Sequence, residues 1–218
     1  MDKVVPIAKA IELIKDGMTV MVAGFLANGT PETLVDALVA KGVKDLTLIT
    51  NDTGFPERGV GKMVVKKQCR KIIASHIGTN PETGRQLNAG ETEVVLIPQG
   101  TLIEKIRCAG VGIGGFLTPT GIGTEVEKDK QKMTVDGKEY LLELPIRADV
   151  ALLYCTTADK AGNLVYTYTQ RNFNPMMAMA ADIVICEAAE IVNAGAIDPN
   201  IVMTPGIFVD YIVRKGDA

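Results

Sequence analysis

The feature that most constrains the fold of this chain is the segment of residues 16–31, which reads DGMTVMVAGFLANGTP. Within it, Thr19–Val22 predicts a short buried strand. Gly24 and Gly29 then interrupt the apolar pattern, and Pro31 predicts the first turn of a helix because proline fits that position. A strand, a glycine turn and a helix in this order present free backbone amides and the positive end of a helix dipole. The segment therefore predicts an anion-binding turn in an α/β sheet.

The same alternation of strands and helices continues along the chain. Short apolar runs with little polar interruption are typical of parallel strands that are covered on both faces. The predicted strands are Leu46–Thr50, Lys71–Ser75, Glu93–Ile97, Asp149–Tyr154 and Asp182–Cys186, and the predicted helices are Ile7–Lys15, Glu32–Ala40, Thr101–Arg107 and Pro175–Ala180.

Residues 131–144 have a different pattern, with an Asp136-Gly137 turn between two short runs. An Asp-Gly pair in this position predicts a β-hairpin. We therefore expect an α/β fold with a wound, mostly parallel sheet flanked by helices, and an antiparallel hairpin flap around residues 131–144. At 218 residues and 47% hydrophobic content, one domain over residues 1–218 is the natural expectation.

Two nucleotide-binding motifs come close to matching the glycine turn. Gly24 and Gly29 have the spacing of a Walker A loop, but Thr30 and Pro31 stand where the lysine and the hydroxyl residue are needed. A dinucleotide fingerprint would find its acidic residue in Asp45, but its glycines are missing. Nucleotide hydrolysis is therefore disfavoured.

Composition and charge exclude several classes of function. The net charge is −3 and the pI about 5.3, with no basic run, so nucleic acid is not expected as a partner. No apolar run is long enough to span a bilayer, and the N-terminus lacks the layout of a signal peptide, which predicts a cytoplasmic protein. Four dispersed cysteines and a single histidine, His76, predict buried reduced thiols and no metal site.

Polar loops follow three of the predicted strands. They are Asn51–Gly54, His76–Pro81 and Pro98–Thr101, and in a parallel sheet they converge with Gly24–Thr30 at one rim. Ordinary turn chemistry explains any single one of these loops equally well, because turns favour Asn, Gly and Pro. For His76, a hydrogen-bonded structural role is the favoured interpretation.

The first segment resembles a signature of the family I coenzyme A transferases, the 3-oxoacid and acetate/butyrate–acetoacetate type. That signature has an acidic residue or Asn, Gly, two residues, three apolar residues, Gly-Gly-Phe, three residues, Gly, any residue and Pro. The matching residues are Asp16-Gly17, Val20-Met21-Val22, Ala23-Gly24-Phe25, Gly29 and Pro31, with Ala23 replacing the first paired glycine.

The resemblance extends over nearly the whole chain. Further similar segments are Pro98–Arg107, the glycine-rich run Ala109–Gly121, Ala161–Asn163 and Arg171–Asn174. In this order they are similar to the first half of fused 3-oxoacid CoA-transferases and to the separate α (A) subunits of bacterial ones.

The resemblance implies a covalent mechanism that this chain does not complete alone. Members of the family use a glutamate in a Ser-Glu-Asn-Gly segment of the second subunit, and no Ser-Glu-Asn occurs here. The implied enzyme is an α₂β₂ complex, with the nucleophile on the β subunit and no catalytic residue in this one. A glutamyl-CoA thioester then carries CoA from an acetyl, butyryl or acetoacetyl group to a free acid, with CoA as substrate and no permanently bound cofactor.

The resemblance also assigns roles to the glycine segments. Gly24, Phe25, Leu26, Ala27, Asn28, Gly29 and Thr30 are expected to hold CoA through amides and the helix start, and Asn51, Gln99, Gly100, Gly114 and Gly115 to line the substrate pocket. The alternatives are a nucleotide-binding domain or a regulatory or scaffolding domain that binds acyl-CoA without catalysis. Activity that requires both subunits distinguishes an enzyme from a scaffold.

Overall fold

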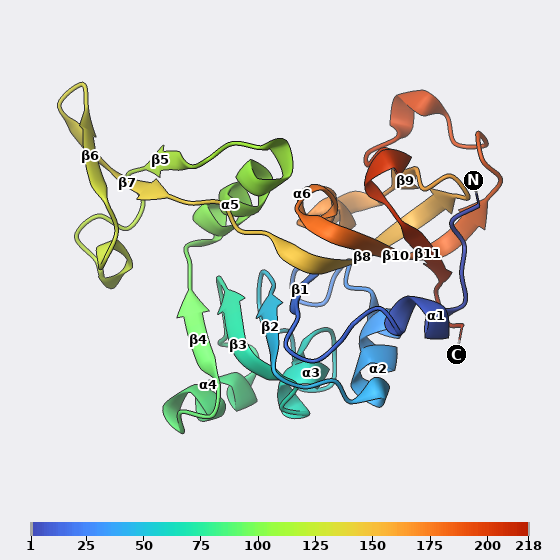
Figure 1. The fold of residues 1–218 in the computed structure, drawn as a ribbon, viewed down its shortest axis with the longest axis horizontal. Coiled ribbons are helices and arrows are strands. Elements are labelled where there is room, and N and C mark those ends of the chain that lie inside the picture. The colour runs from blue at the N-terminus through green and yellow to red at the C-terminus, as the bar shows by residue number, and fades with distance from the viewer. Residues whose placement is uncertain (1, 218) are drawn as a thin grey trace.

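A computed structural model describes residues 2–217 and places an eight-stranded sheet at the centre of the molecule (Figure 1). Seven of its strands pair in parallel in the order β11-β10-β8-β1-β2-β3-β4, and β9 pairs antiparallel to β8. The predicted wound, mostly parallel sheet is confirmed. The strands are β1 Thr19–Val22, β2 Leu46–Ile49, β3 Cys69–Ala74, β4 Glu93–Leu96, β8 Ala148–Asp159, β9 Leu164–Val165, β10 Ala181–Val192 and β11 Tyr211–Arg214.

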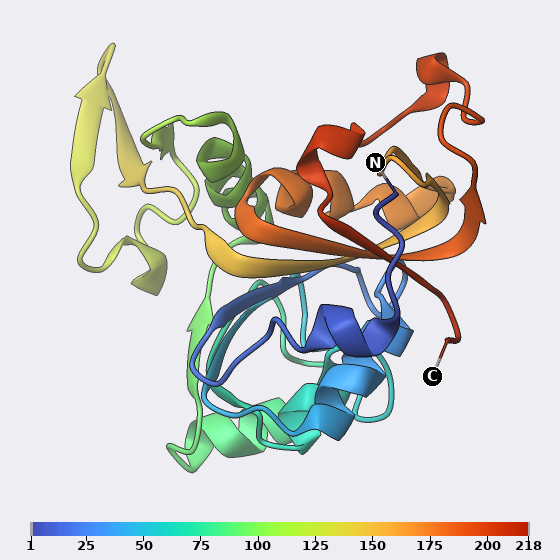
Figure 2. The ribbon, with the colours of Figure 1, turned by 45° about the vertical axis from the view of Figure 1, so that its right-hand side comes forward.

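Helices cover both faces of this sheet (Figure 2). Alternate residues of β1 face opposite cores, with Met21 in one hydrophobic cluster and Val20 and Val22 in the other. On one side lie α1 Ile7–Ile11, α2 Glu32–Lys41, α3 Gly61–Val65 and α4 Pro81–Asn88; on the other lie α5 Gln99–Val111 and α6 Asn174–Met179. Short 3₁₀ helices are η1 Glu125–Glu127, η2 Tyr168–Arg171, η3 Pro199–Ile201 and η4 Gly206–Phe208.

The predicted flap is a three-stranded antiparallel sheet that projects from one end of the molecule (Figure 1). Its strands are β5 Phe116–Thr118, β6 Lys132–Val135 and β7 Lys138–Glu143. Asp136 and Gly137 both have positive φ, at 49° and 75°, as a two-residue hairpin turn of this type requires. The hairpin prediction is confirmed, and the sheet gains β5 as a third strand.

One buried carboxylate attaches the flap to the body. Glu143 is 2% exposed, and it pairs with Lys105 of α5 at 2.8 Å and with Lys130. Burial raises the pKa of Glu143, but the hydrogen bonds from the two lysines outweigh this effect and hold its pKa below the ordinary value. Glu143 is therefore ionised and joins the flap to α5.

Several predicted boundaries are wrong, and two helices were missed. α1 ends at Ile11 because the next turn is closed by backbone hydrogen bonds between residues three apart, as in a 3₁₀ helix. α5 extends beyond Arg107 to Val111. The missed helices are short: α3 has five residues and α4 has eight. Coverage of both faces also fails at the sheet edge, because Leu96 of β4 is 51% exposed.

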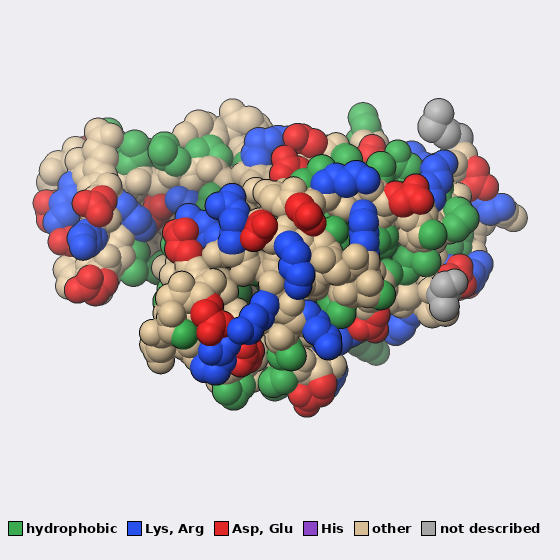
Figure 3. All heavy atoms as spheres, turned by 60° about the horizontal axis from the view of Figure 1, so that its bottom comes forward, with side chains coloured by type: hydrophobic (Ala, Val, Ile, Leu, Met, Phe, Trp, Pro, Cys, Tyr) green, Lys and Arg blue, Asp and Glu red, His purple; other side chains and the backbone are tan. Residues whose placement is uncertain are grey.

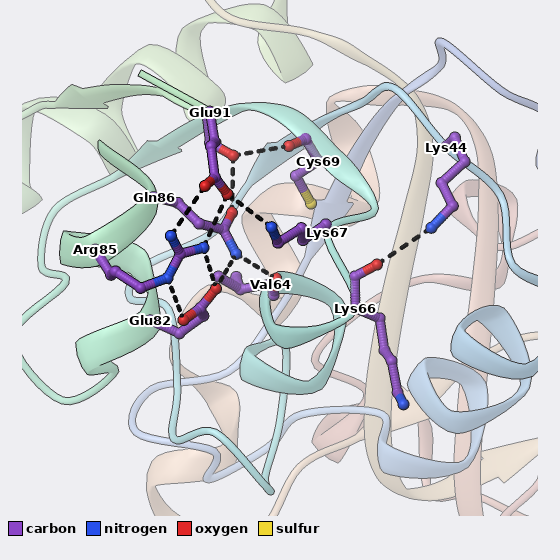
Figure 4. Close-up of polar contacts among 10 residues, drawn as sticks. Lys44, Val64, Lys66, Lys67, Cys69, Glu82, Arg85, Gln86 and Glu91 are labelled. Atoms are coloured by element: carbon purple, nitrogen blue, oxygen red, sulfur yellow. Dashed lines mark hydrogen bonds and ion pairs between the residues drawn. The ribbon is translucent and has the colours of Figure 1, made fainter. Parts of the chain in front are cut away.

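The missed helix α4 is held by a cap and by an ion-pair network, and Figure 4 shows the network. The side chain of Asn80 accepts a hydrogen bond from the Glu82 amide. Arg85 donates bidentate hydrogen bonds to both Glu82 and Glu91, at 2.8 to 2.9 Å, and Lys67 also pairs with Glu91. Glu82 therefore lies in the first turn of a capped helix.

The face turned forward in Figure 3 carries acidic and basic side chains interspersed, without a large field of one sign. Within residues 2–217 no helix is long and apolar enough to cross a membrane. The single-domain expectation and the absence of nucleic acid partners stay predictions.

Candidate active site

The candidate site lies where the chain order of the sheet reverses. β1 and β8 are neighbours, and the chain continues from β1 to β2 on one side and from β8 to β10 on the other, so the connections after these two strands run in opposite directions. In open α/β sheets, ligands bind at the carboxyl ends of strands at such a switch point. The glycine turn that follows β1 occupies this position.

The turn Gly24–Thr30 is tight and strained. Phe25 and Asn28 exchange backbone hydrogen bonds of 3.0 and 2.9 Å, which places Leu26 and Ala27 at the two central positions with φ of 48° and 63°. This left-handed conformation costs a non-glycine residue about 1–2 kcal/mol. Gly24 has φ of 126°, and a Cβ there would lie 1.9 Å from Oγ1 of Thr30. The turn therefore requires glycine at residue 24, and other interactions must offset the strain at Leu26 and Ala27.

A second turn with the same glycine pattern follows β2, although its central residues Pro56 and Glu57 do not have positive φ. Residues 24–29 read GFLANG and residues 54–59 read GFPERG, and Phe55 and Arg58 exchange backbone hydrogen bonds as Phe25 and Asn28 do. A Cβ on Gly59 would lie 3.3 Å from Cβ of Ala27, so the two turns pack side by side. Our sequence analysis missed this pair, although the shared G-F-x-x-x-G pattern is visible in the sequence.

A pocket of about 440 Å³ opens beside the first turn. Four residues that the sequence predicts as site residues line it together: Phe25 and Leu26 from the CoA-binding set, and Asn51 and Gln99 from the substrate set. Asp52, His76 and Thr79 belong to the two polar loops predicted to meet the first turn at this rim, and with Ser75, which was not predicted, they complete the lining. Ser75 directly follows β3, and Asp52 lies in the loop after β2, at the edge of a parallel sheet where ligands bind.

Most polar groups that line this pocket already have partners. Ser75 Oγ donates to Asn51, and Thr79 Oγ1 donates to the carbonyl of Gly54 at 2.6 Å. Asn51 is 2% exposed, and its Nδ2 donates to Asp52 Oδ2 at 2.7 Å. Gln99 is exposed at the start of α5, so its amide is available to a ligand.

The remaining predicted residues lie elsewhere around the turn. Ala27, Asn28, Gly29 and Thr30 line a second hollow of about 320 Å³, together with Glu32, Arg58, Tyr154, Gln170 and Lys215. Gly100 lines a third hollow of about 330 Å³, between the start of α5 and the residues of β5. The first turn thus separates two hollows, and Gly100 faces a neighbouring one.

The glycine-rich run 109–121 is divided between the end of α5 and the segment that leads into β5. Gly110 lies in α5, where a Cβ would approach Cβ of Met179 to 2.5 Å, so this glycine permits close packing of α5 on α6. Gly114 is exposed, and a Cβ on Gly115 would lie 2.8 Å from the carbonyl oxygen of Glu143. Gly114 and Gly115 line none of the three hollows described above.

The amides at the start of α2 are not free for a phosphate, which corrects a further expectation. Oε2 of Glu187, from β10, accepts hydrogen bonds from the amides of Thr33 at 2.8 Å and Leu34 at 3.1 Å. Burial raises the pKa of this fully buried carboxyl, and the amides of Leu34 and Thr33 only partly oppose that effect. The protein's own carboxyl group occupies the anion position at this helix end.

Within residues 2–217 no group of three or more His, Cys, Asp and Glu side chains is arranged to hold a metal ion. The four cysteines are buried and unpaired with one another. Burial raises the pKa of Cys69 to about 12. Buried thiols of this kind are unreactive.

The fold and the pocket define an open α/β protein with a pocket at its topological switch point. Residues 4–215 match the coenzyme A transferase family, and the chain belongs to that family. The chain is 54% identical over 211 residues to the acetate CoA-transferase subunit alpha of Escherichia coli K12, covering 97% of this chain and 96% of that one. It is 50% identical over 213 residues to the acetoacetyl-CoA:acetate/butyrate CoA transferase alpha subunit of Clostridium acetobutylicum, covering 98% of both.

A solved structure supports the same fold at lower identity. The acyl-CoA transferase YdiF from Escherichia coli O157:H7 superimposes with a TM-score of 0.83 at 24% identity, over 98% of this chain. The chain spans 47% of YdiF, which is therefore about twice as long. The resemblance inferred from the glycine segments is confirmed.

Proposed function

We propose that this chain is the α subunit of an enzyme that moves CoA between a short acyl-CoA and a free carboxylic acid. The observation that carries the proposal is the pocket at the switch point, which brings Phe25, Leu26, Asn51 and Gln99 together. The similarity to two alpha subunits that act on acetate, or on acetate and butyrate, supports the same class of substrate here.

The nucleophile in this proposal is a glutamate of a β subunit. Asp52 is the one carboxylate among the residues that line the pocket, and its two oxygens accept three hydrogen bonds from this chain. Three donors stabilise the negative charge of this buried carboxylate, which makes it a poor nucleophile. The pocket therefore calls for a carboxylate from a second chain.

The proposed reaction proceeds through two acyl exchanges. The partner's carboxylate attacks the thioester carbonyl, and the CoA thiolate leaves to give a mixed anhydride. The thiolate then attacks the glutamyl carbonyl and releases the first acid, which leaves a glutamyl-CoA thioester. A new acid reverses these steps, so the thioester bond energy is retained without ATP.

The residues of this chain contribute binding and orientation to that reaction. The exposed amide of Gln99 donates to the acyl oxygen as negative charge develops on it. Phe25 and Leu26 provide the apolar wall for a short acyl chain. Ala27–Thr30, with the cations Arg58 and Lys215 of the second hollow, lie towards the anionic parts of CoA, and Gly100 borders the third hollow.

We further propose an α₂β₂ complex in the cytoplasm, without a permanently bound cofactor. The buried, unpaired cysteines are consistent with a reducing compartment. CoA acts as a substrate that enters and leaves in each cycle.

Reconstitution with the β subunit tests the proposal. CoA exchange is measured between acetyl-CoA and butyrate for each chain alone and for the mixture, and intact mass identifies the chain that carries a CoA adduct. We expect exchange only in the mixture and the adduct only on the partner. Activity of the partner alone would favour the scaffolding alternative.

A matched pair of variants tests the role of Gln99. Gln99→Ala should lower kcat about 10²-fold, as expected for loss of one donor to a developing oxyanion. Gln131→Ala is the control, because Gln131 is also exposed but precedes β6 of the flap and lines none of the described hollows. Equal activity of the two variants would exclude this role for Gln99.

A further inference from the structure

The side chain of Asp52 joins the ends of two neighbouring strands beneath the pocket. Its Oδ2 accepts hydrogen bonds from the amide of Leu26 at 2.8 Å and from Nδ2 of Asn51 at 2.7 Å. Its Oδ1 accepts one from the amide of Gly54 at 2.8 Å. One carboxylate, only 4% exposed, therefore holds the turn after β1, the amide of Asn51 and the turn after β2.

The position of this carboxylate is itself fixed by the sheet. Asp52 forms a parallel β-bridge with His76, and the amide of Thr53 donates to the carbonyl of His76 at 3.2 Å. The hydroxyl of Thr50 also donates to the carbonyl of Asp52. Hydrogen bonds of the neighbouring backbone therefore fix the position from which the Asp52 carboxylate reaches the two turns.

The groups that it holds are those that need support. Leu26 is at the first central position of the strained turn, with φ of 48°, and its side chain is 39% exposed and lines the pocket. Leu26 itself donates the hydrogen bond to Asp52. Its left-handed backbone conformation is unfavourable for any residue with a Cβ, so the bond stabilises a strained position. That bond therefore offsets part of the cost of the left-handed conformation and helps to keep Phe25 and Leu26 at the pocket wall.

We propose that Asp52 is a positioning residue for CoA transfer. Through its hydrogen bonds to Leu26 and Asn51 it sets the shape of the acyl pocket, and it does not act as the nucleophile. This inference rests on the proposed function for its catalytic consequence. Its structural part, that the carboxylate holds the strained turn, is tested independently of activity.

The test uses the αβ complex carrying Asp52→Asn. Asparagine keeps one acceptor oxygen, so it cannot satisfy the Leu26 amide and the Gly54 amide together. We expect amide hydrogen exchange in residues 25–28 to accelerate at least about tenfold, with exchange in α2 unchanged. Misplacement of the pocket wall should lower kcat about 10²-fold, with a smaller change in KM for acyl-CoA.

Two further variants separate positioning from a general loss of stability. Asp136→Asn is the control, because Asp136 lies in the exposed hairpin turn of the flap and asparagine tolerates its positive φ. In the Asp52→Asn background, Ala27→Gly should restore slow exchange in residues 25–28 and part of kcat, because glycine adopts the left-handed conformation without strain.

The outcomes are distinguishable. Faster exchange confined to the turn, lower kcat and rescue by Ala27→Gly support the proposal. Unchanged exchange in residues 25–28, or faster exchange across the whole chain without rescue, would overturn it. If the wild-type complex transfers no CoA between any acids, the proposed function fails, while the exchange data still decide whether Asp52 holds the turn.

Discussion

Replacing Glu143 with alanine should loosen the flap and lower the stability of the whole chain. Glu143 is 2% exposed, and it pairs with two lysine side chains that are themselves only 13% and 24% exposed. Removing one partner of a buried ion pair costs about 3–5 kcal/mol, because the remaining charge is left without compensation. Both lysines retain some access to water, so we expect the lower end of this range, about 3 kcal/mol.

Urea unfolding measures this loss, and hydrogen exchange locates it in residues 131–143. The control is Glu139→Ala on the same strand, since Glu139 is exposed and makes no ion pair in the described part of the chain. Surface substitutions of this kind change stability by about 0.5 kcal/mol or less. If Glu143→Ala and the control lost equal stability, the ion pairs would not hold the flap.

The pH dependence of unfolding tests the role of Glu143 independently. The two lysines lower the folded pKa of Glu143 below its ordinary value of 4.5 despite burial. The stabilisation is therefore complete above the unfolded pKa and is lost as the pH falls through the lowered folded value. The difference in stability between wild type and Glu143→Ala should be full at neutral pH and shrink in strong acid.

Three further predictions follow from the same structure. Arg85→Met should reduce stability at neutral pH and low salt but have no effect near pH 2. Hydrogen bonds from Arg85 lower the pKa of Glu82 and Glu91 to about 2, and the stabilisation by these ion pairs is lost as the pH falls to that value. Thermal melts at several pH values measure this dependence. Gly110→Leu should cost about 1–3 kcal/mol by separating α5 from Met179 of α6, as measured by urea unfolding, and an unchanged midpoint would contradict that packing. No lysine or arginine lines the acyl pocket, so butyrate should be a better acceptor than the dianion succinate, and equal kcat/KM values in the CoA-exchange assay would refute this.

The sequence by itself determined the features that depend on neighbouring residues. The apolar run of β1, the left-handed Gly42 that ends α2 and the Asp136-Gly137 hairpin are all set by local rules, and each is present in the structure. The glycine segments also identified the family, since such turns are written in contiguous residues. Boundaries of longer strands such as β8 were less well predicted, because pairing with β10 extends them beyond their apolar runs.

Only the tertiary structure decided how the site is used. Glu187 occupies the start of α2 although it is 154 residues away from Thr33, and no local pattern reports such a contact. The hydrogen bond from Leu26 to Asp52, the packing of the two G-F-x-x-x-G turns and the position of Gly110 between α5 and α6 likewise depend on the order of strands in the sheet. Local rules describe bonds between residues close in sequence, whereas the folding of the sheet determines which distant groups share a buried space.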